Sequence, residues 1–417
     1  MGSLKRRVVI TGAGCVTSIG TDVASTWQAL LDGKSGGGPI TRFDASAHKV
    51  RFAHEVKGFD VAQYMDRKEA KRADLYTQYA MAAAVQAMRD AGFGEGTGYV
   101  RERTGVIIGS GIGGIETFEA QCKVLFEQGP GRISPFFVPM FIGDIAAGVV
   151  SMRFGAKGPN YATQSACASS AHAIGDAFRL IAYGDADVIV AGGTEAAVSP
   201  MAIGGFANMQ ALSTRNESPE TASRPFDQTR DGFVLGEGSG VVVLEELAHA
   251  KARGARIYAE VVGYGATGDA YHLTGQPEDH EGLQRAMRRA LEDGGLSPAD
   301  VQYVNAHGTS TPLNDPNEIR AIKKVFGPHA TGLNVSSTKS CTGHMLGAAG
   351  AVEAIFTALA ITHGIIPPTI NLTTPDPECD LDCTANVPVR REVHAALSNS
   401  SGFGGHNASL ALRRLTD

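Results

Sequence analysis

Short runs of apolar, mostly β-branched residues alternate along the chain with longer alanine-rich stretches of helical periodicity. This alternation is typical of an α/β protein whose strands are largely buried. Helices are predicted over residues 75–91, before Gly92, and over residues 281–293, before Gly294 and Gly295. The predicted strands span residues 8–10, 106–108, 188–191, 241–244, 258–262, 303–305 and 409–412.

Two parts of this pattern occur twice, which predicts a duplicated fold. The helical stretch at 83–91 and the strand that follows it resemble the helical stretch at 283–293 and its strand. The segments ATQSAC, ending at Cys167, and STKSC, ending at Cys341, each lead from a strand-like run into a helix of small residues. Each half is therefore expected to place a cysteine at a strand-to-helix junction. The charged segment at 248–254 marks the divide, giving halves over residues 1–253 and 254–417.

Composition narrows the classes of function. The chain has 417 residues, 43% hydrophobic and 19% charged, as in an ordinary globular protein. A formal net charge of −6 argues against general binding of nucleic acid or anionic membranes, although a local basic patch could bind an acidic partner. We recognise no targeting segment and no run of about 20 apolar residues, so we expect a cytoplasmic protein without membrane insertion. The six scattered cysteines are expected to be reduced thiols.

Cys167 is the first candidate for chemistry. It lies at a predicted helix start, where unpaired N–H groups and the helix dipole can lower a thiol pKa and stabilise the thiolate. The same N–H groups could hold an oxyanion. A free cysteine is as often a small buried apolar residue, so the position by itself leaves both interpretations open.

Two histidines occupy comparable junctions. His307 follows a predicted buried strand in VNAHGTSTP, and His344 follows Cys341 in KSCTGH. Strand ends are where α/β folds place active groups. A single histidine is more often a packing or hydrogen-bonding residue, but two of them together with Cys167 favour a catalytic set.

A metal site is the competing use of cysteine and histidine. Cys379 and Cys383 are separated by three residues in the acidic segment ECDLDC. No second pair of ligands lies nearby in the sequence to complete four-coordinate zinc, so no metal is predicted.

A glycine motif supports a different class of enzyme. Residues 109–114, GSGIGG, fit G-x-G-x-x-G after a predicted strand, and Glu127 lies roughly where a ribose-binding acid could sit. A dinucleotide-dependent oxidoreductase is therefore the alternative. Against it, the motif follows an entire strand and helix, and the earlier Gly12 and Gly14 are followed by Thr17 where a third glycine belongs.

Five ordered motifs give the chain a family resemblance over nearly its whole length. They are SACASSAHAIGDAF, RPFDQTRDGFVLGEGSG, NAHGTSTPLND, SSTKSCTGHMLGAAGAVEA and SNSSGFGGHNASL. The chain resembles the β-ketoacyl-acyl carrier protein synthases, in the type II elongating branch of the thiolase superfamily. The resemblance implies an α/β thiolase-like fold, in which two duplicated βαβαβαββ halves form a layered αβαβα core.

The resemblance also implies a decarboxylative Claisen condensation. Cys167 would accept the acyl group, and His307 and His344 would bind the malonyl thioester and promote its decarboxylation. The N–H groups of Cys167 and Phe403 would form an oxyanion hole, and Phe403 would also gate the two half-reactions on a glycine-flanked loop. Lys339 corresponds to a structural and electrostatic lysine. Its implied ion partners are Glu353 and Glu318.

Further residues are implied to contact the substrates. Ile112, inside the glycine motif, and Phe206 would line the acyl pocket, while Thr309 and Thr311 would hydrogen-bond the phosphopantetheine arm. No cofactor is implied, because phosphopantetheine arrives on the carrier. The implied partners are acyl carrier protein and a second copy of the chain, and carrier docking is implied for a basic segment and one further arginine, namely Arg67, Lys68, Lys71, Arg72 and Arg132.

Three positions depart from the family pattern: Ser401 replaces a phenylalanine, Ser170 a glycine, and Gln210 a basic residue. The changes concern the gate, the substrate range and a carrier contact. A thiolase would use a second catalytic cysteine, but the residues around Cys341 follow the synthase pattern. A polyketide or specialised-lipid ketosynthase stays an alternative, because it would use the same three catalytic residues.

Overall fold

A computed structural model describes residues 5–416, which form two structurally repeated halves. Each half follows the order βαβαβαββ, with other segments inserted between these elements. The first repeat contains β1 (Val8–Val16), α3 (Leu75–Asp90), β4 (Thr104–Gly109), α6 (Ile145–Phe154), β5 (Asn160–Tyr161), α7 (Ser169–Tyr183), β6 (Val188–Glu195) and β7 (Gly238–Glu246). The second contains β8 (Ala259–Gly268), α10 (Glu281–Gly294), β9 (Tyr303–Asn305), α11 (Asn314–Phe326), β10 (Asn334–Ser336), α13 (Ala349–His363), β13 (Ala395–Gly402) and β14 (His406–Arg413).

The ten strands of the two repeats form one continuous sheet. Its order is β10-β9-β13-β14-β8-β1-β7-β6-β4-β5, so that each half contributes five neighbouring strands in corresponding positions. Antiparallel pairing of β1 with β8 joins the halves, with Val8 opposite Val261 and Ile10 opposite Ala259. In each half the three strands farthest from this seam run parallel to one another. The two strands nearest the seam run antiparallel to their neighbours.

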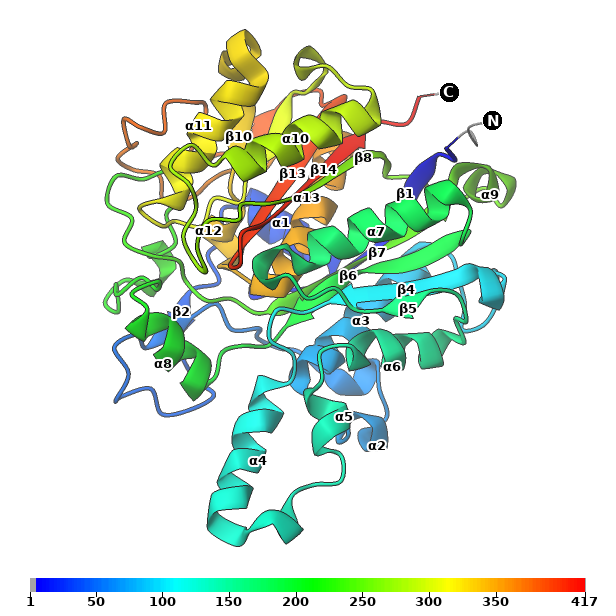
Figure 1. The fold of residues 1–417 in the computed structure, drawn as a ribbon, viewed down its shortest axis with the longest axis vertical. Helices are drawn as coiled ribbons and strands as arrows, with labels where there is room; N and C mark the ends of the chain where they lie inside the picture. The colour runs from blue at the N-terminus through cyan, green and yellow to red at the C-terminus, as the bar shows by residue number, and fades with distance from the viewer. Residues whose placement is uncertain (1–4, 417) are drawn as a thin grey trace.

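Helices and the two half-sheets make five layers (Figure 1). Helices α3 and α6 cover the outer face of one half-sheet, and α10 and α11 cover the outer face of the other. Helices α7 and α13 lie between the half-sheets, where Ile174 and Ile355 belong to the same buried cluster as Ile189 and Leu412. The predicted fold class, with its layered αβαβα core, is confirmed.

Further helices and two small sheets lie around this core. The helices are α1 (Val23–Leu31), α2 (Arg67–Ala70), α4 (Ile115–Gln128), α5 (Phe137–Phe141), α8 (Pro200–Asn208), α9 (Leu247–Ala252) and α12 (Lys339–Thr342). Two small antiparallel sheets pair β2 (Gly38–Pro39) with β3 (Phe52–Ala53) and β11 (Ile365–Ile366) with β12 (Val389–Arg390). The predicted divide at residues 253 and 254 falls between α9 and β8.

The predicted strands and both predicted helices are present. The structure extends most of the strands by a few residues, and the strand predicted from 258 begins at Ala259. The glycine that ends each helix explains the accuracy of those boundaries, because Gly92 has φ +77° and Gly295 has φ +61°. Residues with a side chain rarely adopt this left-handed conformation, which terminates a helix.

One sequence expectation about apolar stretches is wrong. Residues Leu346–His363, comprising a short 3₁₀ turn and α13, form a helical segment long and apolar enough to cross a membrane by length and composition. In the structure 89% of this segment is buried, because it lies between the two half-sheets. The apolar character of α13 therefore reflects its place at the centre of the core.

The duplication does not pair the two cysteines as expected. Cys167 lies in the 3₁₀ turn Ala166–Ala168 before α7, and the equivalent turn before α13 is Leu346–Ala348. The first residues of these turns share an unusual backbone, with φ +49° at Ala166 and +44° at Leu346. The structural counterpart of Cys167 is therefore Gly347. Cys341 lies earlier, in the short helix α12.

Candidate active site

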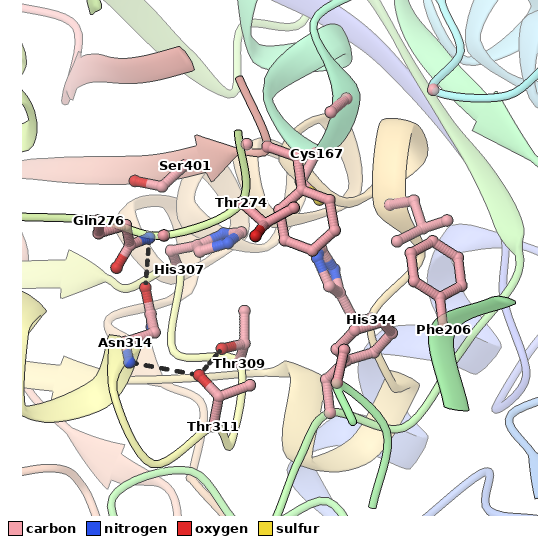
Figure 2. A pocket seen from close by; sticks show the side chains of 18 of the residues that line it. Cys167, Phe206, Thr274, Gln276, His307, Thr309, Thr311, Asn314, His344 and Ser401 are labelled. Atoms are coloured by element: carbon pink, nitrogen blue, oxygen red, sulfur yellow. Dashed lines mark hydrogen bonds between the residues drawn. The ribbon is translucent and has the colours of Figure 1, made fainter. Parts of the chain in front are cut away.

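A cavity of about 320 Å³ contains the predicted catalytic side chains except that of Lys339, which does not line it. Cys167, His307 and His344 all line it, with Phe403 beside them. Figure 2 shows Phe206 on one side of this group and Gln276 and Asn314 on the opposite side. Residues from both halves of the fold therefore meet in one cavity, as the motif positions predict.

The backbone around Cys167 holds the thiol at the start of α7. Ala166 has φ +49°, a strained conformation for a residue with a side chain, and it turns the chain sharply before the helix. The Ser169 hydroxyl accepts the N–H of Ser165 at 2.9 Å and donates to the Ala166 carbonyl at 2.7 Å. The Ser165 hydroxyl lies 2.7 Å from Nδ1 of His172. These contacts fix the turn on both sides of the thiol.

Burial controls the protonation of the thiol. Cys167 is 8% exposed, and burial raises its pKa to about 12. The Lys339 charge and the N–H groups of Phe403 and Cys167 lower the pKa, but they do not offset burial. The expectation that the helix start gives a low thiol pKa is therefore wrong in its net direction. The N–H groups nevertheless act on the thiol pKa in the expected direction.

His307 and His344 form a close pair. Their ring centroids lie 5.2 Å apart with an interplanar angle of 84°, and each residue is 3% exposed. Burial and the Lys339 charge lower the pKa of both imidazoles well below the usual value, so both rings are neutral at pH 7. Within residues 5–416 the Nδ1 atom of each ring is buried without a hydrogen-bond partner. The arrangement leaves Nε2 of each ring as the atom available to a ligand.

Lys339 forms a buried ion pair with Glu353, as predicted. Both residues are 1% exposed, and the Lys339 Nζ contacts the Glu353 carboxylate. Burial raises the pKa of Glu353 to about 7, and the lysine charge opposes this rise. In the described part of the chain the ion pair with Glu353 is the only one that Lys339 makes.

Glu318 has a different contact from the predicted ion pair. Its carboxylate accepts the N–H groups of His307 at 2.9 Å and Gly308 at 2.8 Å. The prediction of a Lys339–Glu318 ion pair is therefore wrong, because the carboxylate is turned toward the backbone of the histidine loop. Glu318 instead fixes that backbone, and the Lys339 charge acts on it only through space.

Phe403 lies in the turn that joins β13 and β14. Gly404 and Gly405, with φ +87° and +76°, form the rest of the turn. A Cβ at Gly402 would lie 2.7 Å from the Ser165 carbonyl oxygen and 3.1 Å from the Cys167 N, so the hairpin approaches the backbone of the Cys167 turn too closely for any residue with a side chain. The Phe403 ring lies 6.4 Å from that of Phe206.

The cavity has an apolar side and a polar side. Ile112 and Phe206 lie on the apolar side, as predicted, and pack with the buried cluster that includes Cys167 and Phe233. Thr309 and Thr311 lie on the polar side, with their hydroxyl oxygens 2.9 Å apart, and Thr311 accepts the N–H of Asn314 at 3.3 Å (Figure 2).

Three polar cavity residues were not identified from the sequence. Gln276 donates to the Asn314 side chain at 3.1 Å, and Thr274 precedes it on the same loop. The loop between β8 and α10 has no hydrophobic period that would place it over a cavity. Asn314 lies within the NAHGTSTPLND motif, and its position at the start of α11 is the signal that could have found it.

The glycine motif is filled by a carboxylate. Glu195, at the end of β6, accepts the N–H groups of Gly111 at 2.8 Å and Ile112 at 3.1 Å. A phosphate group would need these same donors. The dinucleotide interpretation is therefore wrong, because the loop binds a side chain of its own chain. Glu195 was missed in the sequence, because the strand predicted there ended at residue 191, whereas β6 continues to Glu195.

The basic residues predicted to dock a carrier are exposed and lie away from the cavity walls. Arg67 and Lys68 are on α2, followed by Lys71 and Arg72, and Arg132 follows α4. Helices α4 and α5 project from the body at the end where α2 lies (Figure 1). The Arg72 guanidinium stacks over the Phe136 ring at 4.5 Å.

Two departures from the family pattern make specific contacts. Ser170 accepts the N–H of Ala351 at 2.9 Å and so ties α7 to α13. Ser401 donates to the Asn407 side chain at 2.8 Å and lies 3.3 Å from Nε2 of His280. The base of the gate hairpin is therefore polar here. Gln210 is exposed after α8, with φ +58°, and it follows the helix that carries Phe206.

The remaining five cysteines do not line the cavity. Cys379 and Cys383 are buried, and burial raises the pKa of both thiols. All six cysteines lie in the described residues and none forms a disulfide. No group of three or more potential metal ligands occurs among residues 5–416.

Sequence comparisons identify relatives over the full chain. Residues 5–250 match the family Beta-ketoacyl synthase, N-terminal domain, and residues 258–373 match Beta-ketoacyl synthase, C-terminal domain. The chain is 54% identical over 414 residues to 3-oxoacyl-[acyl-carrier-protein] synthase 2 of Staphylococcus aureus (strain COL), covering 99% of each chain. It is 53% identical to the protein of the same name from Synechocystis, covering 98% of each.

Solved structures with the same fold include ketosynthases of two kinds. A β-ketoacyl synthase from Burkholderia phymatum STM815 has a TM-score of 0.92 at 37% identity, covering 99% of this chain and 100% of its own. A ketosynthase in complex with its type II polyketide acyl-carrier protein and bound to a hexaketide has a TM-score of 0.91 at 37% identity, with the same coverage.

Proposed function

The chain belongs to the β-ketoacyl synthase family, and we propose that it is a 3-oxoacyl-[acyl-carrier-protein] synthase that extends fatty acyl chains by two carbons. The observation that carries the proposal is the meeting of Cys167, His307 and His344 in one cavity. The relatives named 3-oxoacyl-[acyl-carrier-protein] synthase 2 support it, since they align over nearly their whole length.

The first half-reaction transfers an acyl group to Cys167. The Cys167 sulfur attacks the thioester carbon, the bond from that carbon to the carrier thiol breaks, and the carrier thiol leaves with the proton that Cys167 loses. The N–H groups of Cys167 and Phe403, which lower the pKa of the thiol, would stabilise the negative oxygen of the tetrahedral intermediate. Because burial keeps the thiol protonated in the free enzyme, attack requires proton transfer as the thioester binds.

The second half-reaction begins with malonyl thioester in the same cavity. Cleavage of the bond to the carboxylate releases carbon dioxide and leaves enolate charge on the thioester oxygen. The neutral rings of His307 and His344 would donate hydrogen bonds from Nε2 to that oxygen. The enolate carbon then attacks the acyl carbon on Cys167, a carbon–carbon bond forms, and the Cys167 sulfur leaves.

The polar side of the cavity suits the arm that delivers both substrates. Phosphopantetheine carries amide groups, and the Thr309 and Thr311 hydroxyls offer hydrogen bonds to them. The proposed partner is an acidic acyl carrier protein in acyl and malonyl forms, and the solved ketosynthase complex with an acyl-carrier protein supports this class. We also propose that the protein is a homodimer and that it acts in the cytoplasm. The basic residues on and after α2 are proposed to dock the carrier.

A polyketide or specialised-lipid ketosynthase is the second candidate. The TM-score of 0.91 with a hexaketide-bound ketosynthase supports it, whereas the identity of 54% with the S. aureus relative favours fatty acyl extension. Incubation with one acyl carrier and excess malonyl carrier distinguishes the two. A fatty acyl synthase should give a product extended once, and a polyketide synthase a series extended several times.

Intact-mass measurement tests the catalytic assignment. Incubation with acyl carrier protein should add one acyl group, and Cys167→Ala should abolish the adduct. Cys341→Ala is the matched control, because burial raises the pKa of that thiol to about 12 as well. An adduct that persists in Cys167→Ala, or that disappears in Cys341→Ala alone, would refute the assignment.

A further inference from the structure

Glu195 is a fully buried carboxylate beside the active site. It lies at the end of β6 and is 0% exposed. Each oxygen accepts two hydrogen bonds. Oε1 accepts the Ser110 hydroxyl at 3.0 Å and the Ile112 N–H at 3.1 Å, while Oε2 accepts the Gly111 N–H at 2.8 Å and the Gly347 N–H at 2.9 Å.

All four groups act as donors, so they stabilise an ionised carboxylate. Burial raises the pKa of Glu195, and the hydrogen bonds oppose that rise. In the described residues no basic side chain forms an ion pair with it. A buried carboxylate without a cation is costly unless its hydrogen bonds are complete. Here they are complete, and they connect loops from the two halves of the fold.

The loops around Glu195 leave no spare space. A Cβ at Gly111 would lie 2.7 Å from Oε2, and a Cβ at Gly347 would lie 2.8 Å from the same oxygen and 2.3 Å from the Gly111 N. These distances are shorter than van der Waals contact. The glycine motif is therefore shaped so that two backbone segments can close on one carboxylate.

The same two segments form a wall of the cavity. Gly111 and Ile112 line it from the first half, and Leu346, next to Gly347, lines it from the second. Leu346 belongs to the apolar cluster that contains Cys167, and Ile112 packs against it. Glu195 thus ties the backbone of Ile112 to the backbone of Gly347, next to Leu346.

We propose that Glu195 is a positioning residue that determines acyl-chain specificity, by holding the Ile112 loop against the Leu346 turn and so fixing the depth of the apolar side of the cavity. This inference rests on the proposed function, since it concerns which acyl group Cys167 receives. It also gives a role to the glycine motif that does not involve a nucleotide.

The carboxylate has a second effect, on the nucleophile. Cys167 is influenced by Lys339, which favours the thiolate, and by Glu195, which favours the neutral thiol. His307 and His344 face the same cavity and are neutral at pH 7. Removing the Glu195 charge should therefore lower the pKa of Cys167, whereas a purely structural role would leave it unchanged.

Acyl-chain profiles of three proteins test the inference. Initial rates of Cys167 acylation are measured with carrier-bound chains of increasing length for the wild type, Glu195→Gln and Glu245→Gln. The glutamine amide cannot accept two of the four hydrogen bonds, so the wall loosens and longer chains gain about tenfold relative to short ones. Glu245 is the matched control, because it is also buried on the sheet and pairs with Val188 at the opposite end of β6.

The pH dependence of Cys167 alkylation by iodoacetamide, followed by peptide mass mapping, tests the effect of the Glu195 charge on the pKa of the thiol. Glu195→Gln should shift the profile to lower pH. Glu195→Asp keeps the charge but has a shorter side chain, so its alkylation profile should match the wild type while its acyl-chain profile changes. If Glu195→Gln does not fold, Ser110→Ala removes a single donor and should shift the acyl-chain profile in the same direction by a smaller factor.

The outcomes separate this inference from the proposed function. An unchanged acyl-chain profile in folded Glu195→Gln, or in Ser110→Ala where only that variant folds, refutes the specificity role. A shift of equal size in Glu245→Gln refutes it as well. If wild-type Cys167 accepts no acyl group from any carrier, it is the proposed function that fails.

Discussion

The rings of His307 and His344 lie edge to face, 5.2 Å apart, although the two residues follow different strands of the second half. Hydrogen bonds to the backbone of each histidine hold the two rings at this spacing. Glu318 holds the His307 backbone, and the His344 N–H donates to the Val234 carbonyl at 2.8 Å. The pair is thus held by contacts that do not use the ring nitrogens.

Replacing either histidine should separate the two half-reactions. His307→Ala and His344→Ala are expected to keep acylation of Cys167 and to lose carbon dioxide release from malonyl carrier by about 100-fold or more, because each removes a donor to the enolate oxygen. Intact mass and a carbon dioxide assay measure the two steps. Normal decarboxylation by both variants would contradict the assignment.

Decarboxylation should not follow the usual titration of histidine. The pKa values of His307 and His344 lie well below 6.5, so the neutral, donating form persists as the pH falls through that value. The rate of carbon dioxide release by Cys167→Ala should therefore stay level between about pH 5.5 and 7.5. Halving of the rate near pH 6.5, with the protein still folded, would show that burial does not hold the rings neutral.

The buried ion pair predicts a pH-dependent loss of stability. Lys339→Met leaves Glu353 unpaired, which should lower the free energy of unfolding by about 3–5 kcal/mol. The pKa of Glu353 is already raised to about 7, so the residue can take up a proton at low pH, and the loss should be larger at pH 8 than at pH 5. Urea denaturation at both pH values measures this. Lys339→Met with Glu353→Gln should recover part of the loss, and no recovery would argue against the pair as its source.

The gate hairpin should not tolerate a single added methyl group at Gly402. The new Cβ would approach the Ser165 carbonyl and the Cys167 N, so the hairpin must move and take the Phe403 N–H with it. Acylation of Cys167 should slow by about 100-fold, with at most about 1–3 kcal/mol lost in stability. Gly268→Ala is the control, since it lies opposite His406 on the neighbouring strand and its Cβ would make only an ordinary contact, 4.0 Å from the Gly405 carbonyl oxygen. Equal effects of both substitutions would show that the close approach at Gly402 is not the cause.

The sequence predicted best those features that depend on adjacent residues. Both glycine-terminated helices end where expected, because a left-handed residue terminates a helix whatever surrounds it. The cavity residues Cys167, His307 and His344 were found because each lies in a compact motif at a strand or helix end.

Features that depend on tertiary distance were missed or misplaced. Glu195 has an unremarkable sequence context, and only the folded chain brings Gly347 to it. The Glu318 carboxylate accepts the N–H of His307 instead of pairing with Lys339. Sequence spacing does not predict which of these two contacts forms. The thiol pKa was mispredicted because the helix start was visible in the sequence and the depth of burial was not.

Gly347 occupies the position that Cys167 has in the first repeat, which makes the two repeats chemically unequal. Both repeats keep the sharp left-handed turn before their central helix, but one turn carries a thiol and the other gives its N–H to Glu195. The duplicated backbone therefore has two similar turns, and of these two only the first bears a nucleophile. The second turn supplies Leu346 to the cavity wall, so the same backbone motif serves both the reacting sulfur and the surface beside it.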